Sequence, residues 1–399
     1  MRPMFAVLSS ARKMMARAFS RPLACLAFVA LAACEPIDLG GLGGGGQQID
    51  PGKAVPVALL LPRGGGNSGD DLISQNLENA ARLAAAELNG AQIELRVYAT
   101  GGNAQTAAAQ AQKAVDEGAK IILGPLRAES ANAAGVAVAD DGVNVLAFSN
   151  NTSIAGGNVF VLGSTFENTA GRLMGYAASK GHGNIVLVHS NDVGGTAARN
   201  AVQKAAASSG ARIVGTVDYA LSQQGVAQSV PRIKAAVSNG SADAVFLDAT
   251  TSGALPLFAT MLPEAGINPA TTQYLGLSRW DIPAQSLSLP GLQGGLFVLP
   301  DPSRTAAFNG RYQAAYGSAP HPIAGIAFDA VAAVGALVAR GNRDALSRSS
   351  LTQSSGFQGA TGAFRLLPDG SNQRAVAVAT VQNGQAVIVD AAPRSFSGF

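Results

Sequence analysis

Cysteine is nearly absent from this sequence, which holds only Cys25 and Cys34. Both lie close to the N-terminus, and the rest of the chain has no pair that could form a disulfide and no thiolate cluster for a structural zinc site. A chain of this length can bury a core large enough to be stable without such crosslinks. We therefore expect a fold that is stabilised by packing alone.

The sequence also lacks the residue patterns of common catalytic sites. Its three histidines, His182, His189 and His321, lie far apart, and none has a partner at the helical spacing of a zinc site. There is no Gly-x-Ser-x-Gly nucleophile turn and no phosphate-binding loop that ends in Gly-Lys-Ser or Gly-Lys-Thr. A catalytic site assembled from dispersed residues stays open as an alternative. The pattern favours a protein without enzymatic activity, metal or cofactor.

Acidic residues are missing from the first 33 positions, which instead carry five positive charges. An apolar stretch over residues 23–33 follows and ends at Cys34. A basic start, a short apolar segment and small residues before the cut are typical of a secretory signal, and a membrane span would need about 20 residues. Leu31-Ala-Ala-Cys34 resembles the lipobox of bacterial lipoproteins. This resemblance implies that residues 1–33 are removed and that Cys34 is lipidated; an ordinary secretory signal is the alternative.

Removal of the signal changes the charge of the protein. The signal holds five of the 28 Lys and Arg residues and none of the 25 Asp and Glu residues, so the remaining chain is slightly acidic. We therefore expect no nucleic-acid partner, which would need a basic face. Residues 34–54 are rich in glycine and poor in large apolar side chains. They predict a flexible tether between the lipid and a folded part that spans residues 55–399.

Strand and helix patterns alternate from Val55 onward. Short apolar runs typical of buried parallel strands lie at residues 55–61, 93–99, 120–124, 144–149, 159–162, 184–189, 211–219, 243–248 and 273–276. Segments with helical spacing separate them, at residues 72–89, 104–117, 130–140, 166–180, 196–208, 226–238 and 253–264. The alternation predicts an α/β fold with two doubly wound parallel-sheet lobes and an interlobe cleft.

The C-terminal part of the chain differs from this alternation. Residues 322–339 are almost entirely apolar, but Asp329 in their middle and several small residues favour a buried helix over a membrane segment. Further on, Asp369-Gly370 and Asn383-Gly384 each separate two β-prone runs. These two dipeptides predict hairpin turns.

Polar loops follow most of the predicted strands, where open α/β sheets bind ligands and helix N-termini offer backbone N–H groups. For each loop, turn formation or helix capping is the alternative role, because Ser, Asn, Asp and Gly are common turn residues. The only tryptophan, Trp280, either lines the cleft or covers the core. The candidate ligand-binding residues are Arg63, Arg127, Ser130, Ser149, Asn150, Asn151, Asn191, Thr250, Arg279 and Trp280.

Several of these segments together resemble the leucine-type (type I) periplasmic binding proteins. The similar segments include Val57-Ala-Leu-Leu-Leu-Pro62, Ile121-Ile-Leu-Gly-Pro-Leu126, Val143-Asn-Val-Leu-Ala-Phe-Ser-Asn150 and Phe357-Gln-Gly-Ala-Thr-Gly-Ala-Phe364. The resemblance implies two lobes joined by three crossovers, with a cleft that closes on a ligand. It places the first lobe at about residues 55–164 plus 298–355 and the second at about 165–297 plus 356–399.

Two functional classes share this resemblance. One is the solute-binding subunit of an amino-acid or amide ABC importer, which commonly holds its ligand through hydroxyls after the third strand and through an aromatic and an acid from the second lobe. Here Arg127 and Ala128 follow the third strand, and Thr250 and Arg279 stand where a clear aromatic and acid are expected. Ser149 keeps a polar group after the fourth strand. This departure weakens the importer hypothesis.

The other class is the penicillin-binding protein activator, an outer-membrane lipoprotein that stimulates a peptidoglycan synthase. Gly124-Pro-Leu126 and Val159-Phe-Val-Leu-Gly163 look more like this branch. Glu35 follows the lipidated cysteine where an aspartate often directs retention at the inner membrane, which favours the outer membrane. We therefore expect a periplasmic protein that is attached to the membrane by its lipid only and whose partner is a peptidoglycan synthase (penicillin-binding protein). A solute-binding protein for a small amino-acid-like ligand is the alternative.

Overall fold

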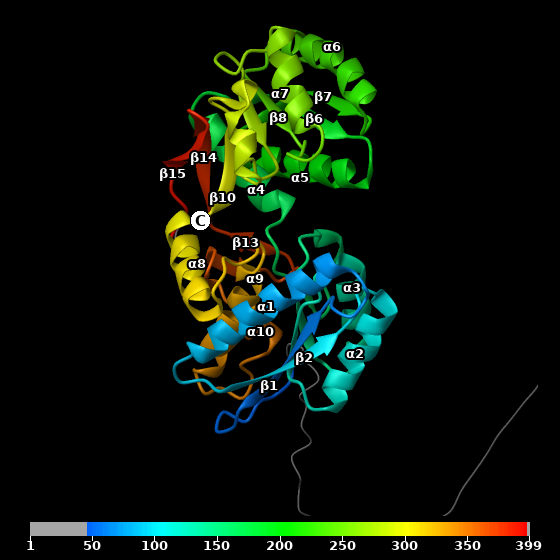
Figure 1. Cartoon of the computed structure of the whole chain (residues 1–399), viewed down its shortest axis with the longest axis vertical. Coiled ribbons are helices and arrows are strands. Elements are labelled where there is room, and N and C mark those ends of the chain that lie inside the picture. The colour runs from blue at the N-terminus through cyan, green and yellow to red at the C-terminus, as the bar shows by residue number, and fades with distance from the viewer. Residues whose placement is uncertain (1–45, 397–399) are drawn as a thin grey trace, which may run out of the picture. The chain divides into compact units, whose positions relative to one another are not determined.

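The computed structural model describes residues 46–396. The predicted signal, the predicted lipidation site Cys34 and most of the predicted tether lie outside these residues. The first lobe is built on a parallel sheet of five strands in the order β2-β1-β3-β4-β5 (Figure 1). Its strands are β1 (Val55–Leu61), β2 (Ile93–Ala99), β3 (Ile121–Leu123), β4 (Asn144–Ala147) and β5 (Val159–Val161).

Helices cover both faces of this sheet because the side chains of each strand alternate between the faces. In β1, Val57 and Leu59 belong to a core shared with two of the helices, α1 and α9, whereas Ala58 and Leu60 belong to a core shared with α2 and α3. Both cores are closed to solvent, so β1 is apolar on every position between Val57 and Leu61. The helices of this lobe are α1 (Ser68–Ala86), α2 (Ala104–Asp116), α3 (Ala128–Ala137), α8 (Pro302–Tyr316), α9 (Gly325–Val338) and α10 (Arg348–Leu351), with a 3-10 turn η1 (Thr152–Ile154).

The second lobe is built on a sheet of seven strands in the order β15-β14-β10-β9-β8-β6-β7. The strands from β7 to β10 are parallel, while β14 and β15 extend the sheet in antiparallel fashion. The strands are β6 (Asn184–Ser190), β7 (Arg212–Tyr219), β8 (Ala244–Leu247), β9 (Gln273–Gly276), β10 (Leu296–Pro300), β14 (Val376–Gln382) and β15 (Gln385–Asp390).

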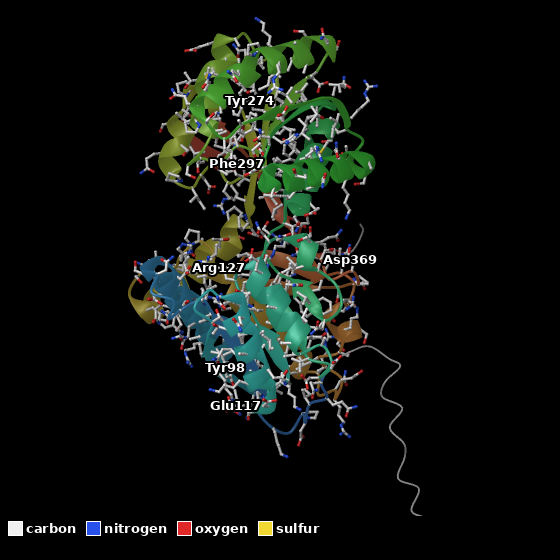
Figure 2. All side chains as sticks on the ribbon, turned by 90° about the vertical axis from the view of Figure 1, so that its right-hand side faces the viewer. Tyr98, Glu117, Arg127, Tyr274, Phe297 and Asp369 are labelled. Carbon is white, nitrogen blue, oxygen red and sulfur yellow. The ribbon has the colours of Figure 1, made fainter. Side chains whose placement is uncertain are left out.

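The same alternation fills the two faces of the second sheet. Val186 and Val188 face the core that α6 and α7 cover, and Leu187 faces the core that α4 and α5 cover. Tyr274 and Phe297 lie inside this lobe (Figure 2). The helices are α4 (Phe166–Ser179), α5 (Val193–Ser209), α6 (Gln223–Asn239) and α7 (Leu255–Glu264), and the 3-10 turns are η2 (Ala284–Ser288) and η3 (Pro290–Leu292). The predicted α/β class with two parallel-sheet lobes is therefore confirmed.

A small antiparallel sheet of three strands follows α10, consisting of β11 (Phe357–Gly359), β12 (Gly362–Leu366) and β13 (Asn372–Arg374). Phe357, Phe364 and Leu366 are part of the first-lobe core. The assignment of residues to the two lobes thus differs from the expected one at two places in the C-terminal half of the chain. Residues 356–366, expected in the second lobe, pack in the first, and residues 298–300, expected in the first lobe, lie in β10 of the second sheet.

The apolar segment at residues 322–339 forms the buried helix α9, as the sequence predicts, and Asp329 has no exposed surface. Among the described residues, no helix is long and apolar enough to cross a bilayer. Both predicted hairpin turns are also confirmed, with Asp369-Gly370 between β12 and β13 and Asn383-Gly384 between β14 and β15. Asn383 and Gly384 have φ angles of 52° and 72°, which fits the turn type that asparagine and glycine favour.

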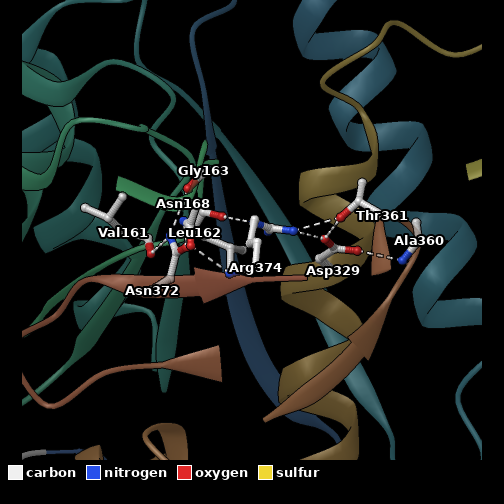
Figure 3. Close-up of polar contacts among 9 residues, drawn as sticks. All are labelled: Val161, Leu162, Gly163, Asn168, Asp329, Ala360, Thr361, Asn372 and Arg374. Atoms are coloured by element: carbon white, nitrogen blue, oxygen red, sulfur yellow. Dashed lines mark hydrogen bonds and ion pairs between the residues drawn. The ribbon is translucent and has the colours of Figure 1, made fainter. Parts of the chain in front are cut away.

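The chain passes between the lobes at three points: after β5, after β10 and after β13. The first and third crossovers are joined by buried side chains (Figure 3). Asn372 donates hydrogen bonds of 2.8 Å to the carbonyl oxygens of both Val161 and Gly163, and the Arg374 Nε donates to that of Leu162 at 2.8 Å. Arg374 also pairs with Asp329 at 2.8 Å. The crossovers are thereby attached to the core of the first lobe.

Candidate ligand-binding site

The two parallel sheets have the same strand order, which indicates where each lobe would bind a ligand. In β2-β1-β3-β4-β5 the chain reverses its direction of winding between β1 and β3, and in β7-β6-β8-β9-β10 it does so between β6 and β8. Open α/β sheets bind ligands beyond the carboxyl ends of their strands at this point, because the two following loops diverge there and leave a crevice. The loops after β1, β3, β6 and β8 therefore form the candidate site.

In the first lobe an ion pair connects the segments that follow β1 and β3. Arg127, which follows β3 and precedes α3, donates from one guanidinium nitrogen to both carboxylate oxygens of Asp70, at 2.7 and 2.8 Å. Asp70 lies in the first turn of α1, after β1. The Arg127 side chain remains half exposed (Figure 2). Arg63 is similarly occupied by an ion pair with Glu78. Both predicted arginines thus lie at the expected end of the sheet, each held by a carboxylate of α1.

The hydroxyl and amide residues of this lobe lie after β3 and β4. The Asn151 N–H donates to the Ser149 Oγ at 3.1 Å, and the Asn151 Oδ1 accepts from the Ser153 N–H at 2.9 Å. These contacts are those of a turn, but they leave the Ser149 hydroxyl hydrogen available. Ser130, in the first turn of α3, is buried, and its Oγ has no hydrogen-bond partner among the described residues. Asn150 is exposed.

In the second lobe, a partly buried carboxylate lies at the corresponding point. Asp248, just after β8, accepts hydrogen bonds from the Tyr219 Oη at 2.7 Å, from the Ser190 N–H at 2.7 Å and from the Ser190 Oγ at 3.0 Å. Tyr219 and Ser190 are the last residues of β7 and β6, so the cluster joins three adjacent strands. Ser190 also contacts Asp192, which caps α5.

Asp248 has no ion-pair partner within 4 Å among residues 46–396. Burial raises its pKa, because a charged carboxylate loses solvation there. Burial and the neighbouring Asp248 both raise the pKa of the Tyr219 hydroxyl, which therefore stays protonated and donates. A partly buried carboxylate that is held by hydrogen bonds but has no ion-pair partner is suited to receive a cationic group.

The ligand-binding residues that the sequence predicts in the second lobe are not among the side chains that hold Asp248. Asn191 and Thr250 are exposed, and Arg279 is paired with Asp281 through contacts of 2.6 and 2.5 Å within the same loop. Trp280 covers the core: it has no exposed surface and stacks on Phe297 with ring centroids 5.8 Å apart. Of its two predicted roles, the structural one is correct.

The expectation that the second lobe offers no aromatic and acid pair is wrong, because Tyr219 and Asp248 form one. The sequence pattern places both at the ends of predicted strands, residues 211–219 and 243–248, and not in the loops that follow. The sequence does carry a signal, since Asp248 ends the otherwise apolar run Ala244-Val-Phe-Leu247. An acid in that place must be solvated, paired or hydrogen-bonded.

A comparison with protein-family models matches residues 54–386 to the family described as periplasmic binding protein. The match covers most of the chain, so the chain belongs to the periplasmic binding protein family. This is a family of binding proteins, in agreement with the interpretation of the sequence as non-catalytic. Among curated proteins, none matches the chain significantly.

Solved structures support the fold. A putative branched-chain amino acid ABC transporter protein from Rhodospirillum rubrum superposes with a TM-score of 0.72 at 18% identity, covering 84% of this chain and 100% of that one. An ABC transporter substrate-binding protein from Desulfitobacterium hafniense in complex with Leu gives 0.63 at 20% identity, covering 84% and 100%. A solute-binding protein from R. palustris in complex with benzoate gives 0.57 at 19% identity, covering 86% and 97%. At these identities the likeness shows the fold alone.

Proposed function

We propose that this protein is the solute-binding component of an ABC importer and that its solute is a small zwitterion, such as an amino acid. The observation that carries the proposal is Asp248, a partly buried carboxylate at the carboxyl ends of β6, β7 and β8 that has no ion-pair partner within 4 Å among the described residues. It would receive the ammonium group of the solute. Tyr219 and Ser190 would hold it in place.

The first lobe offers groups of the opposite kind. The Ser149 hydroxyl, the Ser130 Oγ and the backbone N–H groups at the start of α3 are donors, and a helix N-terminus favours an anion. These donors fit a carboxylate, and both Leu and benzoate, named in the two complexes above, carry one. Val193 and Leu221 follow β6 and β7 with exposed fractions of 88% and 62%, which suits an apolar body between the two charges.

The test is a thermal-shift and calorimetry screen of the chain from residue 35 onward against amino acids, amides and simple carboxylates. A ligand at about a thousand times its dissociation constant should add roughly 4 kcal/mol of stability. Asp248→Asn should lower the affinity for a zwitterion at least about tenfold, because a charge-assisted hydrogen bond is lost. Asp243→Asn, at the opposite end of β8, is the matched control.

Ser149→Ala should cost about 1–3 kcal/mol of affinity by leaving a ligand oxygen unpaired. A solute whose affinity is unchanged by both Asp248→Asn and Ser149→Ala would refute this assignment of the site. Binding of simple carboxylates that is insensitive to Asp248→Asn alone would show that the first lobe supplies the specificity.

The importer hypothesis replaces the activator hypothesis as the better supported one, because the solved structures named above are ABC transporter proteins. Activation of a peptidoglycan synthase predicts instead a flat solute screen and direct binding to a purified penicillin-binding protein. The same preparation can be used for both assays, so one panel separates the two functions.

Attachment to a membrane through a lipid on Cys34 is part of the proposal. Cys34→Ser should release the protein into the soluble periplasmic fraction and abolish incorporation of labelled palmitate. Release without a change in labelling would contradict lipidation at this residue, and fractionation of the wild type separates inner from outer membrane.

A further inference from the structure

A groove of about 860 Å³ lies on a different part of the molecule, and none of the strand-end residues named above lines it. One wall comes from α4 and α5 of the second lobe. The other comes from β13 with the turn before it, where Asp369 is labelled in Figure 2, and from residues near Pro393. The groove is within the size range of small-ligand sites, and its walls belong to both lobes.

Two glycines open the groove along α4. Gly171 and Gly175 lie one helical turn apart, in line with Glu167, and all three line the groove. A Cβ added at either glycine would meet nothing within 4 Å. Alanine would therefore fit at both positions and would stabilise the helix by about 1 kcal/mol each. Packing among the described residues does not require glycine here.

The charged side chains that line the groove differ in whether they have an ion-pair partner. Arg172 is fully engaged, with hydrogen bonds of 3.0 Å to the carbonyl oxygens of Val376 and Ala391 and an ion pair of 2.9 Å with Asp390. Glu167 and Lys204 have no ion-pair partner within 4 Å in the described part of the chain; Glu167 accepts only from the Thr152 Oγ1, at 2.9 Å. Asp369, a further carboxylate of the groove, accepts from the Ser371 N–H and Oγ at 2.9 and 2.5 Å, and the Lys204 charge helps to lower its pKa. Glu167 and Lys204 thus remain as an anion and a cation without an ion-pair partner among the described residues.

These two charges lie near opposite ends of the groove. The helices α4 and α5 both run from the carboxyl to the amino end of the sheet, since one precedes β6 and the other lies between the parallel strands β6 and β7. Glu167 is in the first turn of α4, whereas Lys204 is in the C-terminal half of α5, and Lys204 and Tyr176 both line the groove. At a rise of 1.5 Å per residue, Glu167 and Tyr176 are separated by roughly 13 Å along the axis.

We propose that this groove binds a zwitterionic peptide of three or four residues, with its ammonium group at Glu167 and its carboxylate at Lys204. An extended peptide spans about 3.3–3.6 Å per residue, so this length matches the separation of the charges. The open space over Gly171 and Gly175 accommodates its backbone. Tyr176 provides aromatic surface for its side chains. The occupant contacts both lobes and is distinct from the solute at the strand ends.

The first experiment fills the groove. The probe is an equimolar library of tripeptides and tetrapeptides with free termini at about 1 mM, with bound peptides identified by native mass spectrometry. Gly175→Leu should reduce retention at least about tenfold. Gly310→Leu is the matched control, because Gly310 is also a helical glycine with nothing within 4 Å of an added Cβ but lies on α8. Retention of no peptide by the wild type, or equal retention by Gly175→Leu, overturns the proposal.

The second experiment tests the charges on the peptides that are retained. Amidation of the peptide C-terminus should weaken binding to the wild type about tenfold but should not affect binding to Lys204→Ala. Acetylation of the peptide N-terminus should likewise weaken binding to the wild type but should not affect binding to Glu167→Gln. Asp248→Asn should leave peptide retention unchanged. If Asp248→Asn abolishes it, the peptides bind at the strand ends and the groove proposal is wrong, whereas the solute-binding function would stand.

Discussion

Two carboxylates, one buried and one partly buried, show how one residue type serves two purposes in this molecule. Asp329 has no exposed surface, but it is paired with Arg374 and accepts from the Ala360 N–H at 2.7 Å and the Thr361 Oγ1 at 2.6 Å (Figure 3). Asp248 also accepts three hydrogen bonds, from Tyr219 and Ser190, but has no ion-pair partner within 4 Å among residues 46–396. The first arrangement is complete without a ligand, and the second is not.

Removal of the Asp329 charge should be strongly destabilising. Asp329→Asn leaves the Arg374 guanidinium, which is itself 7% exposed, without its countercharge, and the loss of one partner of a buried pair costs about 3–5 kcal/mol. Urea unfolding should show this decrease in the free energy of unfolding. The control is Asp218→Asn, whose pair with Arg232 is half exposed and should contribute less than about 1 kcal/mol. Equal effects of the two substitutions would contradict the assignment.

Asp248→Asn should have the opposite effect on stability. Because the pKa of Asp248 is raised in the folded state, the folded protein holds this proton more tightly than the unfolded chain, and wild-type stability falls as the pH rises through the folded pKa. An asparagine can accept from the Ser190 N–H and donate to the Tyr219 Oη without this cost. The variant should therefore melt higher than the wild type at neutral pH, with the difference vanishing near pH 4 and below. A variant that melts lower at pH 7 would contradict the argument.

At the scale of elements, the connection from β6 to α5 sets the position of the binding cluster. Asp192 caps α5 by accepting from the Gly195 N–H at 2.7 Å. This cap brings Gly195 directly against the end of β6: a Cβ at Gly195 would lie 1.8 Å from the Ser190 carbonyl oxygen and 2.5 Å from its Oγ. Only glycine allows the helix to start so close to the strand.

Gly195→Ala should therefore displace Ser190 and weaken the hold on Asp248. We expect a loss of about 1–3 kcal/mol in stability, as is usual for overpacking, and a clear loss of solute affinity. Gly194→Ala is the neighbouring control, because its Cβ would meet only the Asp192 side chain, at 3.5 Å. Calorimetric titration and thermal melting of the two variants would check this, and similar behaviour of both would show that the close approach is unimportant.

Most helices and strands of the two large sheets follow from the sequence because the central strands are buried on both faces and must be apolar throughout, as in β1 and β8. The positions of β1, β2 and β9 coincide with the predicted runs. The lobe to which β11 and β12 belong does not follow, since Phe357 and Phe364 would suit either core equally well. Their place depends on the turn of the chain after α10, which no local pattern specifies.

The candidate site was predictable in its location but less so in its composition. The rule that ligands bind after parallel strands placed Arg127 and Ser149 at the correct edge. The rule does not predict the ion pair between Arg127 and Asp70, because these residues are far apart in the sequence and the strand order brings them together. Tyr219 and Asp248 were missed for the same reason: their hydrogen bond spans three strands that are adjacent in the sheet but separated along the chain.

At the scale of the whole molecule, the two lobes are joined by segments that are themselves tied together. Asn372 is 5% exposed, and its amide bridges the first crossover, at Val161 and Gly163, to the third. Its Oδ1 accepts from Asn168 of α4 at 2.7 Å. One side chain thus links the small sheet, a crossover and the first helix of the second lobe.

Asn372→Ala should lower the stability by about 2–3 kcal/mol, since buried carbonyl groups lose their donors, and it should also alter the rates of solute binding. Asn158→Ala is a matched control: its amide likewise donates to two carbonyl oxygens, of Gly135 and Val143, but within the first lobe only. Stopped-flow binding should separate the two variants even where urea unfolding does not. Unchanged rates in Asn372→Ala would show that the bridge has no part in ligand binding.

The three crossovers also govern when this protein can fold during its synthesis. The first-lobe core contains residues from Ile49 to Leu366, and the cores of the second lobe extend to Val378 and Val381. Neither lobe can close its interior until nearly the whole chain has left the ribosome. We therefore expect the growing polypeptide to complete its fold only when its synthesis is nearly finished.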